Sequence, residues 1–260
     1  MLLTIDVGNT NTVLGVHEAA ELRAHWRLTT RREQTADEYG ILVRNLFAAS
    51  ALEPKRIEGV ALASVVPPLT PVLVELARLY LGHDPLVVEP GVRTGMPILY
   101  EPPGDVGADR IVNGVAAFAA YGGPVIVVDF GTATTFDVVT KKGEYAGGVI
   151  CPGIGISADA LFQRAARLPR VDVRHPGRVI GRSTVGSIQA GLYFGYAEMV
   201  NGLIGRIRGE LQEPARVVAT GGLAESLAAD IPSIEAVDPV LTLTGLRLIW
   251  ERNRLSAPKA

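Results

Sequence analysis

The sequence predicts an α/β protein with two homologous domains, and an internal repeat is the strongest reason. The segment TIDVGNTNTV at residues 4–13 aligns without gaps with VVDFGTATTF at residues 127–136. The alignment pairs Asp6 with Asp129, Gly8 with Gly131, and Thr12 with Thr135. In both halves of the 260-residue chain, predicted strands around this segment are followed by predicted helices. Two duplicated domains explain this pattern better than one doubly wound sheet.

The composition supports a folded protein and excludes several classes of partner. Hydrophobic residues make up 48% of the chain and charged residues 20%, which allows packed cores. The net charge of −2 provides no basic surface for nucleic acid or for an anionic membrane. The N-terminal segment MLLTID does not resemble a signal peptide, and every apolar run is too short to span a bilayer. We therefore expect a soluble, cytoplasmic protein without a membrane or nucleic-acid partner.

Cysteine and histidine usage gives no sign of a metal centre. The single cysteine, Cys151, cannot form a disulfide within the chain and lies in an apolar context. No Cys/His spacing is typical of zinc. The four histidines have no cluster spacing, and we assign no role to His17, His25, His83 or His175.

The first half is predicted to begin with a three-stranded meander and to continue with alternating helices and strands. The strands are expected at residues 2–8, 12–18 and 22–30. The segment TADE at residues 35–38 has the form of a capping box, so a helix should begin there. One face of this helix should carry Tyr39, Leu42, Val43, Leu46 and Phe47. A buried strand at 57–66, a helix at 67–82 and a short strand at 85–89 should follow.

The second half is predicted to repeat this order after a Gly- and Pro-rich loop at residues 91–108. We expect a helix at about 105–121, a hairpin at 124–139, a third strand at 145–150, helices near 157–168 and 184–211, and a strand at 215–220. The apolar stripe of the long helix predicts a core or dimer face and comprises Ile188, Leu192, Tyr196, Met199, Leu203 and Ile207. Asp238 should cap a last helix. The predicted domains are residues 1–115 and 116–260.

The repeated turn has the chemistry of a site for a metal–nucleotide complex. Each copy places a carboxylate, Asp6 or Asp129, at the end of a buried strand, followed by glycine and short hydroxyl or amide side chains. Backbone N–H groups and such side chains suit phosphate oxygens, whereas the carboxylate requires an intervening cation. A single copy is also good hairpin chemistry. Recurrence in the second half favours a ligand, because two facing copies would form a cleft.

Two other phosphate-binding motifs are poorly matched. A Walker A loop is absent, since the dipeptide Gly-Lys does not occur; GRVIGRST at 177–184 has arginine for lysine and a gap that is one residue short. The segment GIGISA at 153–158 imitates a dinucleotide fingerprint, but the residues before it make a poor entry strand. A glycine-rich entry to a helix is the better interpretation.

Five segments together resemble the type III pantothenate kinases, which belong to the superfamily of acetate and sugar kinases, heat-shock chaperones and actin. They are DVGNTNT at 6–12, GADR at 107–110, DFGTATT at 129–135, GGVICPG at 147–153 and TGG at 220–222. The resemblance implies two ribonuclease-H-like domains with mixed sheets and an active site in the interdomain cleft. It implies ATP-dependent phosphorylation of pantothenate to 4'-phosphopantothenate, the first step of coenzyme A biosynthesis. It also implies Mg²⁺ with ATP, a monovalent cation (K⁺ or NH₄⁺) and a homodimer.

The resemblance also implies roles for individual residues. Asp109 would be the general base. The ATP and phosphate contacts would be Asp6, Val7, Gly8, Asn9, Thr10, Asn11, Thr12, Val13, Thr132, Thr220, Gly221 and Gly222. The pantothenate contacts would be Tyr100, Gly107, Ala108, Asp109, Arg110 and Thr184. Asp129 would hold the monovalent cation, and Asp6 would hold Mg²⁺ through water.

Simpler interpretations and other functions remain open from sequence. Asp109 and Arg110 could form a solvated ion pair at the start of a helix, and Tyr100 could be a packing residue. The substrate could be another small hydroxyl or carboxylate compound. The protein could also be a nucleotide-binding regulator without kinase activity, although the three aspartates Asp6, Asp109 and Asp129 favour an active enzyme.

Overall fold

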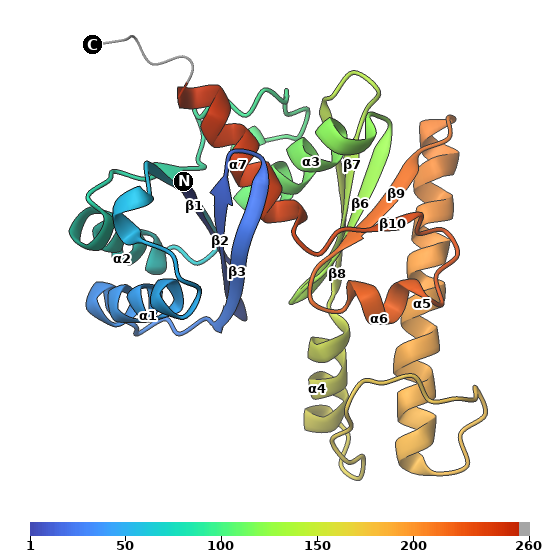
Figure 1. Ribbon diagram of the computed structural model, residues 1–260. Coiled ribbons are helices and arrows are strands. Elements are labelled where there is room, and N and C mark those ends of the chain that lie inside the picture. The colour runs from blue at the N-terminus through green and yellow to red at the C-terminus, as the bar shows by residue number, and fades with distance from the viewer. Residues whose placement is uncertain (255–260) are drawn as a thin grey trace. The chain divides into compact units, whose positions relative to one another are not determined.

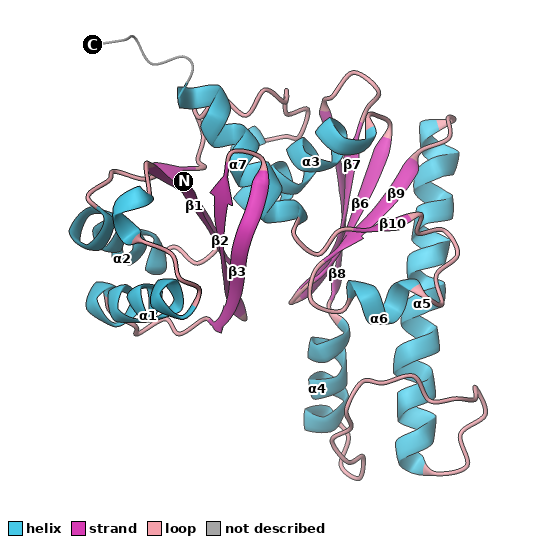
Figure 2. Ribbon diagram, viewed as in Figure 1, coloured by secondary structure: helices cyan, strands magenta, loops and turns pink. Residues whose placement is uncertain are grey.

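A computed structural model describes residues 1–254, in which each of two runs of three consecutive strands is followed by helices and further strands (Figures 1 and 2). The chain divides into two compact units. The first comprises Met1–Ala116 together with the described chain from Leu241 onward, and the second comprises Ala117–Val240. No helix within these 254 residues combines the length and apolar character needed to cross a bilayer.

The first unit is built on a five-stranded mixed sheet with the order β3-β2-β1-β4-β5. Its strands are β1 (Leu2–Val7), β2 (Asn11–Glu18), β3 (Glu21–Thr29), β4 (Gly59–Ser64) and β5 (Leu86–Val87). The first three strands form the predicted antiparallel meander, whereas β4 runs parallel to β1 and β5 runs parallel to β4. The carboxyl ends of β1 and β4 therefore lie at the same edge of the sheet.

Helices cover both faces of this first sheet. The helices α1 (Ala36–Ala49) and α2 (Leu69–Leu76) lie on one face of this sheet (Figure 1). Ile5 and Phe47 are buried in the core of this unit. The helix α7 (Leu241–Arg254) packs on β1, β2 and β4. The predicted capping box is confirmed, since Thr35 and Glu38 exchange hydrogen bonds with each other's backbone N–H groups. The short helices of this unit are η1 (Pro54–Arg56), the π-helical turn η2 (Ala77–Leu81) and η3 (Pro103–Asp105).

The second unit repeats the same architecture. Its sheet has the order β8-β7-β6-β9-β10, with β6–β7–β8 antiparallel and β6, β9 and β10 parallel. The strands are β6 (Val125–Phe130), β7 (Ala133–Val139), β8 (Tyr145–Pro152), β9 (Arg216–Thr220) and β10 (Ala236–Val237). The helices are α4 (Ile154–Arg164), α5 (Thr184–Leu211) and α6 (Ala224–Ala228), and α3 (Ala108–Tyr121) runs across the division between the units.

The duplication is real, but the alignment of the repeat needs one correction. Strand pairing places Val7 opposite Thr12 in the first unit and Phe130 opposite Thr134 in the second. The second turn is therefore one residue shorter, and Thr12 corresponds to Thr134 rather than to Thr135. Both threonines are fully buried, and β2 and β7 share the same burial pattern from this position on. The ungapped alignment was wrong because residues 134 and 135 are both threonine, so Thr12 finds an identical partner with or without a one-residue gap.

Three other expectations differ from the structure. The helix α7 belongs to the first unit, whereas the sequence boundary placed all of residues 116–260 in the second domain; residues 255–260 lie outside the described chain. This helix begins at Leu241, and Asp238 accepts a hydrogen bond from the N–H group of Val240 before it. The helix α4 begins and ends a few residues earlier than predicted.

The buried face of α5 is also rotated from the predicted stripe. The fully buried positions are Gln189, Ala190, Tyr193, Tyr196, Ala197, Val200 and Ile204, so only Tyr196 is common to both sets. The other members of the predicted stripe are partly buried, and four of them, Leu192, Met199, Leu203 and Ile207, pack against the same core. The buried face includes the small residues Ala190 and Ala197, which a pattern of large apolar residues does not reveal.

Candidate active site

The turn between β1 and β2 carries the first predicted phosphate site. Asp6 is half-buried in β1, between Val13 of β2 and Ala63 of β4. The N–H group of Gly8 donates to the carbonyl oxygen of Asn11 at 2.9 Å, which closes a tight hairpin. Its exposed tip consists of Asn9 and Thr10. Backbone and side-chain donors therefore project beyond the strand end at which the carboxylate of Asp6 lies.

Thr30, which the sequence analysis did not single out, fixes the shape of this turn. Its Oγ1 donates to the carbonyl oxygen of Gly8 at 2.7 Å and lies 2.9 Å from Oγ1 of Thr12. Its backbone N–H donates to the carbonyl oxygen of Thr10 at 3.0 Å. Thr12 is fully buried, and its contact with Thr30 links β2 to the residue that holds the turn. The only signal in the sequence was the pair of threonines at the end of β3.

The segment GADR lies at the same end of the first sheet as the Asp6 turn. Val65 follows β4 and donates its N–H to the carbonyl oxygen of Val7 at 3.0 Å. A methyl group added at Gly107 would lie 3.6 Å from Cγ1 of Val65 and 2.6 Å from Oδ1 of Asp109. Gly107 is thus needed for the close approach of Asp109. Ligands of α/β sheets bind beyond the carboxyl ends of parallel strands, and this edge has that position.

Burial changes the acidity of Asp109. Removal from water raises the pKa of its carboxyl group, and this effect exceeds the opposing effects of Arg110. Oδ1 accepts a hydrogen bond of 2.8 Å from the backbone N–H of Arg110. The side chain of Arg110 is itself buried, at 7% exposure, so the two residues are not a solvated surface pair. A carboxylate with a raised pKa accepts a proton more readily than an ordinary one.

In the second unit, Asp129, Thr220 and Gly221 come together at the corresponding edge. Asp129 of β6 lies opposite Thr135 of β7 and beside Thr220 of β9. Gly221 has φ = +93°, and a methyl group there would overlap Oδ1 of Asp129 and lie 2.7 Å from the backbone N of Phe130. Only glycine fits this position, which gives the TGG segment a physical reason. Gly222 follows and is exposed.

The second turn holds Thr132 by its backbone. The N–H of Gly131 donates to the carbonyl oxygen of Ala133 at 3.0 Å, and Thr132 is exposed at the tip. Gly153, the N-cap of α4, donates its N–H to the carbonyl oxygen of Thr132 at 3.1 Å. A methyl group at Gly153 would overlap that oxygen. This contact explains the glycine that ends the GGVICPG segment.

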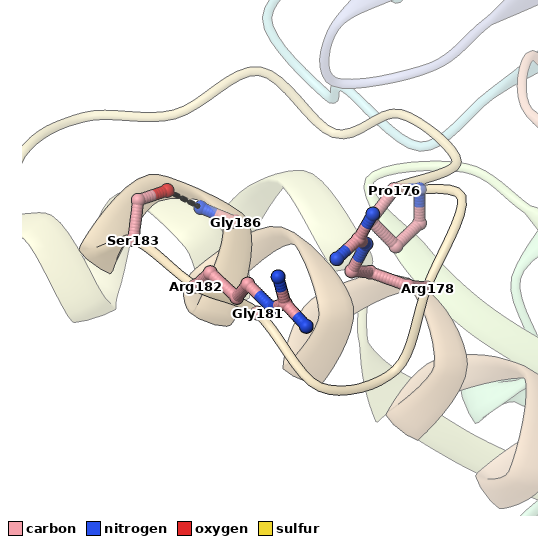
Figure 3. Close-up of a pocket in the computed structure, with 6 residues that line it drawn as sticks. All are labelled: Pro176, Arg178, Gly181, Arg182, Ser183 and Gly186. Carbon is pink, nitrogen blue, oxygen red and sulfur yellow. Dashed lines mark hydrogen bonds between the residues drawn. The ribbon is translucent and has the colours of Figure 1, made fainter.

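The remaining predicted substrate contacts lie in two places. Tyr100 is half-buried in the irregular segment before η3, in the first unit. Thr184 is the first residue of α5, after the N-cap Ser183, whose Oγ accepts a hydrogen bond of 3.1 Å from the N–H of Gly186. A pocket of about 290 Å³ adjoins this helix end, and the guanidinium groups of Arg178 and Arg182 line it (Figure 3).

The two sheets of identical strand order, each with an Asp-x-Gly turn at the end of its first strand, define the duplicated ribonuclease-H-like fold of the actin-like ATPases. Solved structures with this fold cover nearly the whole chain. A polyphosphate/ATP-glucomannokinase from Arthrobacter sp. strain KM has a TM-score of 0.51 and 15% identity, and covers 98% of this chain and 99% of its own. A Campylobacter jejuni protein described as a Baf family transcriptional activator has a TM-score of 0.62 and 19% identity, over 97% and 99% of the two chains.

Sequence comparison then identifies the family. The sequence model of type III pantothenate kinase matches residues 2–206. The type III pantothenate kinase of Moorella thermoacetica is 58% identical over 253 residues, which cover 97% of this chain and 100% of the relative. The chain belongs to the type III pantothenate kinase family, and the family resemblance expected from its five segments is confirmed.

Proposed function

We propose that the protein transfers the γ-phosphoryl group of ATP to the primary hydroxyl group of pantothenate and forms 4'-phosphopantothenate, the first step of coenzyme A biosynthesis. Family membership supports this reaction. The observation that carries the proposal in the molecule itself is the shared position of Asp109 and the Asp6 turn at one end of the first sheet. A proton acceptor and a phosphate-binding turn on the same edge are what phosphoryl transfer to a hydroxyl group requires.

The residues of the first turn fit ATP with Mg²⁺. Mg²⁺ keeps most of its water ligands and needs few protein carboxylates, so the single half-buried Asp6 is a suitable partner through water. Among the described residues, no three His, Cys, Asp or Glu side chains gather as a metal-ligand cluster, so a water-rich ion is the appropriate kind. Bound Mg²⁺ would neutralise charge on the β- and γ-phosphates. The backbone of Gly8 to Val13 and the exposed Asn9 and Thr10 would bind phosphate oxygens.

The second unit would supply the other nucleotide contacts and a monovalent cation site. Thr132 would contact the phosphates, and Thr220, Gly221 and Gly222 would contact the adenosine. We assign the cation, K⁺ or NH₄⁺, to the carboxylate of Asp129. Because Gly221 has no side chain, the Asp129 carboxylate can occupy its position at the end of β6.

Asp109 would act as the general base, and neighbouring residues would hold pantothenate. The raised pKa of Asp109 suits a group that takes the proton of the attacking hydroxyl. The guanidinium of Arg110 matches the single carboxylate of pantothenate. Tyr100, Gly107, Ala108 and Thr184 complete the proposed substrate contacts.

The protein is further proposed to be a cytoplasmic homodimer. Large apolar side chains are exposed between residues 150 and 185, among them Ile150, Ile156, Phe162, Ile180 and Val185. Ile150 is 61% exposed and Ile180 is 82% exposed, so their burial against another chain would be favourable. A second copy would cover them.

An ADP-release assay tests the function. The purified full-length protein should form ADP from ATP only when pantothenate, Mg²⁺ and either K⁺ or NH₄⁺ are all present. Turnover that prefers another small hydroxyl compound would assign a different substrate. Nucleotide binding without turnover on any compound of the panel would instead favour a regulator.

A further inference from the structure

The two halves of the duplicated fold differ beside their equivalent aspartates. Strand pairing makes Asp6 equivalent to Asp129, and the residue opposite each aspartate is Val13 in the first unit and Thr135 in the second. Two positions further along, the first unit has Gly15 and the second has Asp137. At these two positions of the second strand, polar side chains in the second unit stand where the first unit has an apolar side chain or none.

Asp137 and its neighbours form a buried polar network in the second sheet. Asp137 is completely buried. Its Oδ1 accepts a hydrogen bond of 2.7 Å from the hydroxyl of Tyr145, and its Oδ2 accepts one of 3.0 Å from Oγ1 of Thr135. A buried carboxylate is retained only where donors satisfy it, and these two hydroxyls do so. The hydroxyl proton of Thr135 is therefore committed to Asp137.

This network determines what Thr135 presents to Asp129. Residues opposite each other in an antiparallel pair lie on the same face, with their Cβ atoms about 5 Å apart. Since the proton of Thr135 points to Asp137, its oxygen lone pairs remain available on the side of Asp129. A lone-pair donor beside a carboxylate suits an ion that sheds water easily, such as K⁺, and also accepts the N–H groups of NH₄⁺.

The first unit lacks this arrangement. The methyl groups of Val13 beside Asp6 offer no oxygen ligand. The space at Gly15 is filled, because a methyl group there would lie 2.8 Å from Cδ1 of Leu243 and 3.0 Å from Oγ1 of Thr4. A cation at Asp6 therefore keeps its waters, which Mg²⁺ prefers.

We propose that Oγ1 of Thr135 is a ligand of the monovalent cation at Asp129, and that Asp137 and Tyr145 orient this hydroxyl group. The inference rests on the cation site of the proposed function. The two differences within the duplicated hairpin, Val13 versus Thr135 and Gly15 versus Asp137, would then explain how two equivalent aspartates serve two different ions. Thr135 is a specificity-determining ligand, and Asp137 is a positioning residue.

The test measures K⁺ binding by the full-length protein through its thermal stability, without substrates. K⁺ is titrated against a tetraalkylammonium salt at constant ionic strength, and the rise in Tm gives the half-saturating concentration. Thr135→Val keeps the shape and removes the oxygen, and it should raise this concentration about ten- to a hundredfold. Thr135→Ser keeps the hydroxyl and should restore wild-type affinity. Thr134→Val is the control, because Thr134 points to the opposite face of β7.

Each outcome decides the inference. Wild-type K⁺ affinity in Thr135→Val, or the absence of a K⁺-specific rise in the wild type, would overturn it. The Tm of Thr135→Val without K⁺ shows whether this variant folds. If it does not fold, Thr135→Ala replaces it and should show the same weakening of K⁺ binding. Wild-type K⁺ affinity in Thr135→Ala would also refute Thr135 as a ligand. Asp129→Asn separates the underlying proposal: an unchanged K⁺ response in that variant rejects the site at Asp129 itself. Pantothenate-dependent ADP formation by the wild type is scored independently.

Discussion

Lowering the pH should destabilise the first unit through a single buried histidine. His17 of β2 is 2% exposed and lies between Leu2 of β1 and Leu22 of β3, beneath α7. Burial, and then the nearby guanidinium of Arg247, lowers the pKa of His17 from 6.5 to about 4, against a smaller opposing effect of the Leu243 backbone. The folded protein therefore keeps this imidazole neutral.

The sign and size of the effect follow from linkage. Above pH 6.5 His17 is neutral in both states, so stability is highest. As the pH falls from 6.5 toward 4, the unfolded chain binds a proton that the folded chain does not, and stability is lost. A shift of this size corresponds to about 3 kcal/mol once pH 4 is reached, and to about 2 kcal/mol between pH 8 and pH 5.

Tryptophan fluorescence provides an assay that is specific to this unit. Both tryptophans, Trp26 and Trp250, lie in the first unit, where Trp26 stacks on Phe47 with ring centroids 5.8 Å apart. Urea unfolding would be followed by their emission at pH 8, 7, 6 and 5. His17→Leu is the matched variant, since it fills a similar volume and cannot titrate. The variant should lose about 2 kcal/mol less than the wild type between pH 8 and pH 5. Equal losses in both proteins would refute the assignment to His17.

Two further predictions concern the site. Asp109→Asn should leave ATP binding nearly unchanged and lower kcat by at least about a hundredfold, because it removes the proton acceptor. The control Asp105→Asn, at an exposed neighbouring carboxylate, should change neither ATP binding nor kcat. Unchanged turnover in Asp109→Asn would remove Asp109 as the base. Gly221→Ala should lower Tm and weaken K⁺ and nucleotide binding, because its methyl group overlaps the Asp129 carboxylate. The control is Gly122→Ala, which also has a positive φ but no atom within 4 Å of the added methyl group, so it should cost only backbone strain of about 1–2 kcal/mol. Equal behaviour of the two variants would contradict the steric argument.

Local patterns in the sequence were enough to predict the secondary structure and the duplication. The capping box at Thr35 and Glu38 fixed the start of α1, and the bounds of α5 matched the predicted helix at 184–211. Short apolar segments separated by brief polar breaks predicted the strands of both meanders. These features depend on residues a few positions apart, whose interactions the sequence states directly.

The types of the site residues were predictable from the sequence, but the contacts that hold those residues in place were not. The sequence located Asp6, Asp109 and Asp129 through motifs. It could not reveal that Thr30 holds the first turn by a hydrogen bond, or that Gly221 lacks a side chain where the Asp129 carboxylate lies. These contacts join segments far apart in the chain. The raised pKa of Asp109 likewise arises from burial, which only packing produces.

The sequence by itself determined the two-domain α/β class, the order of elements, the strand-end aspartates and the family. The tertiary structure alone decided that α7 joins the first unit, that α5 buries the face containing Ala190 and Ala197, and that Thr134 rather than Thr135 matches Thr12. The physical reason is the same in each case. An amphipathic helix or a strand specifies that one face must be buried, whereas the partner and the register are chosen by long-range packing.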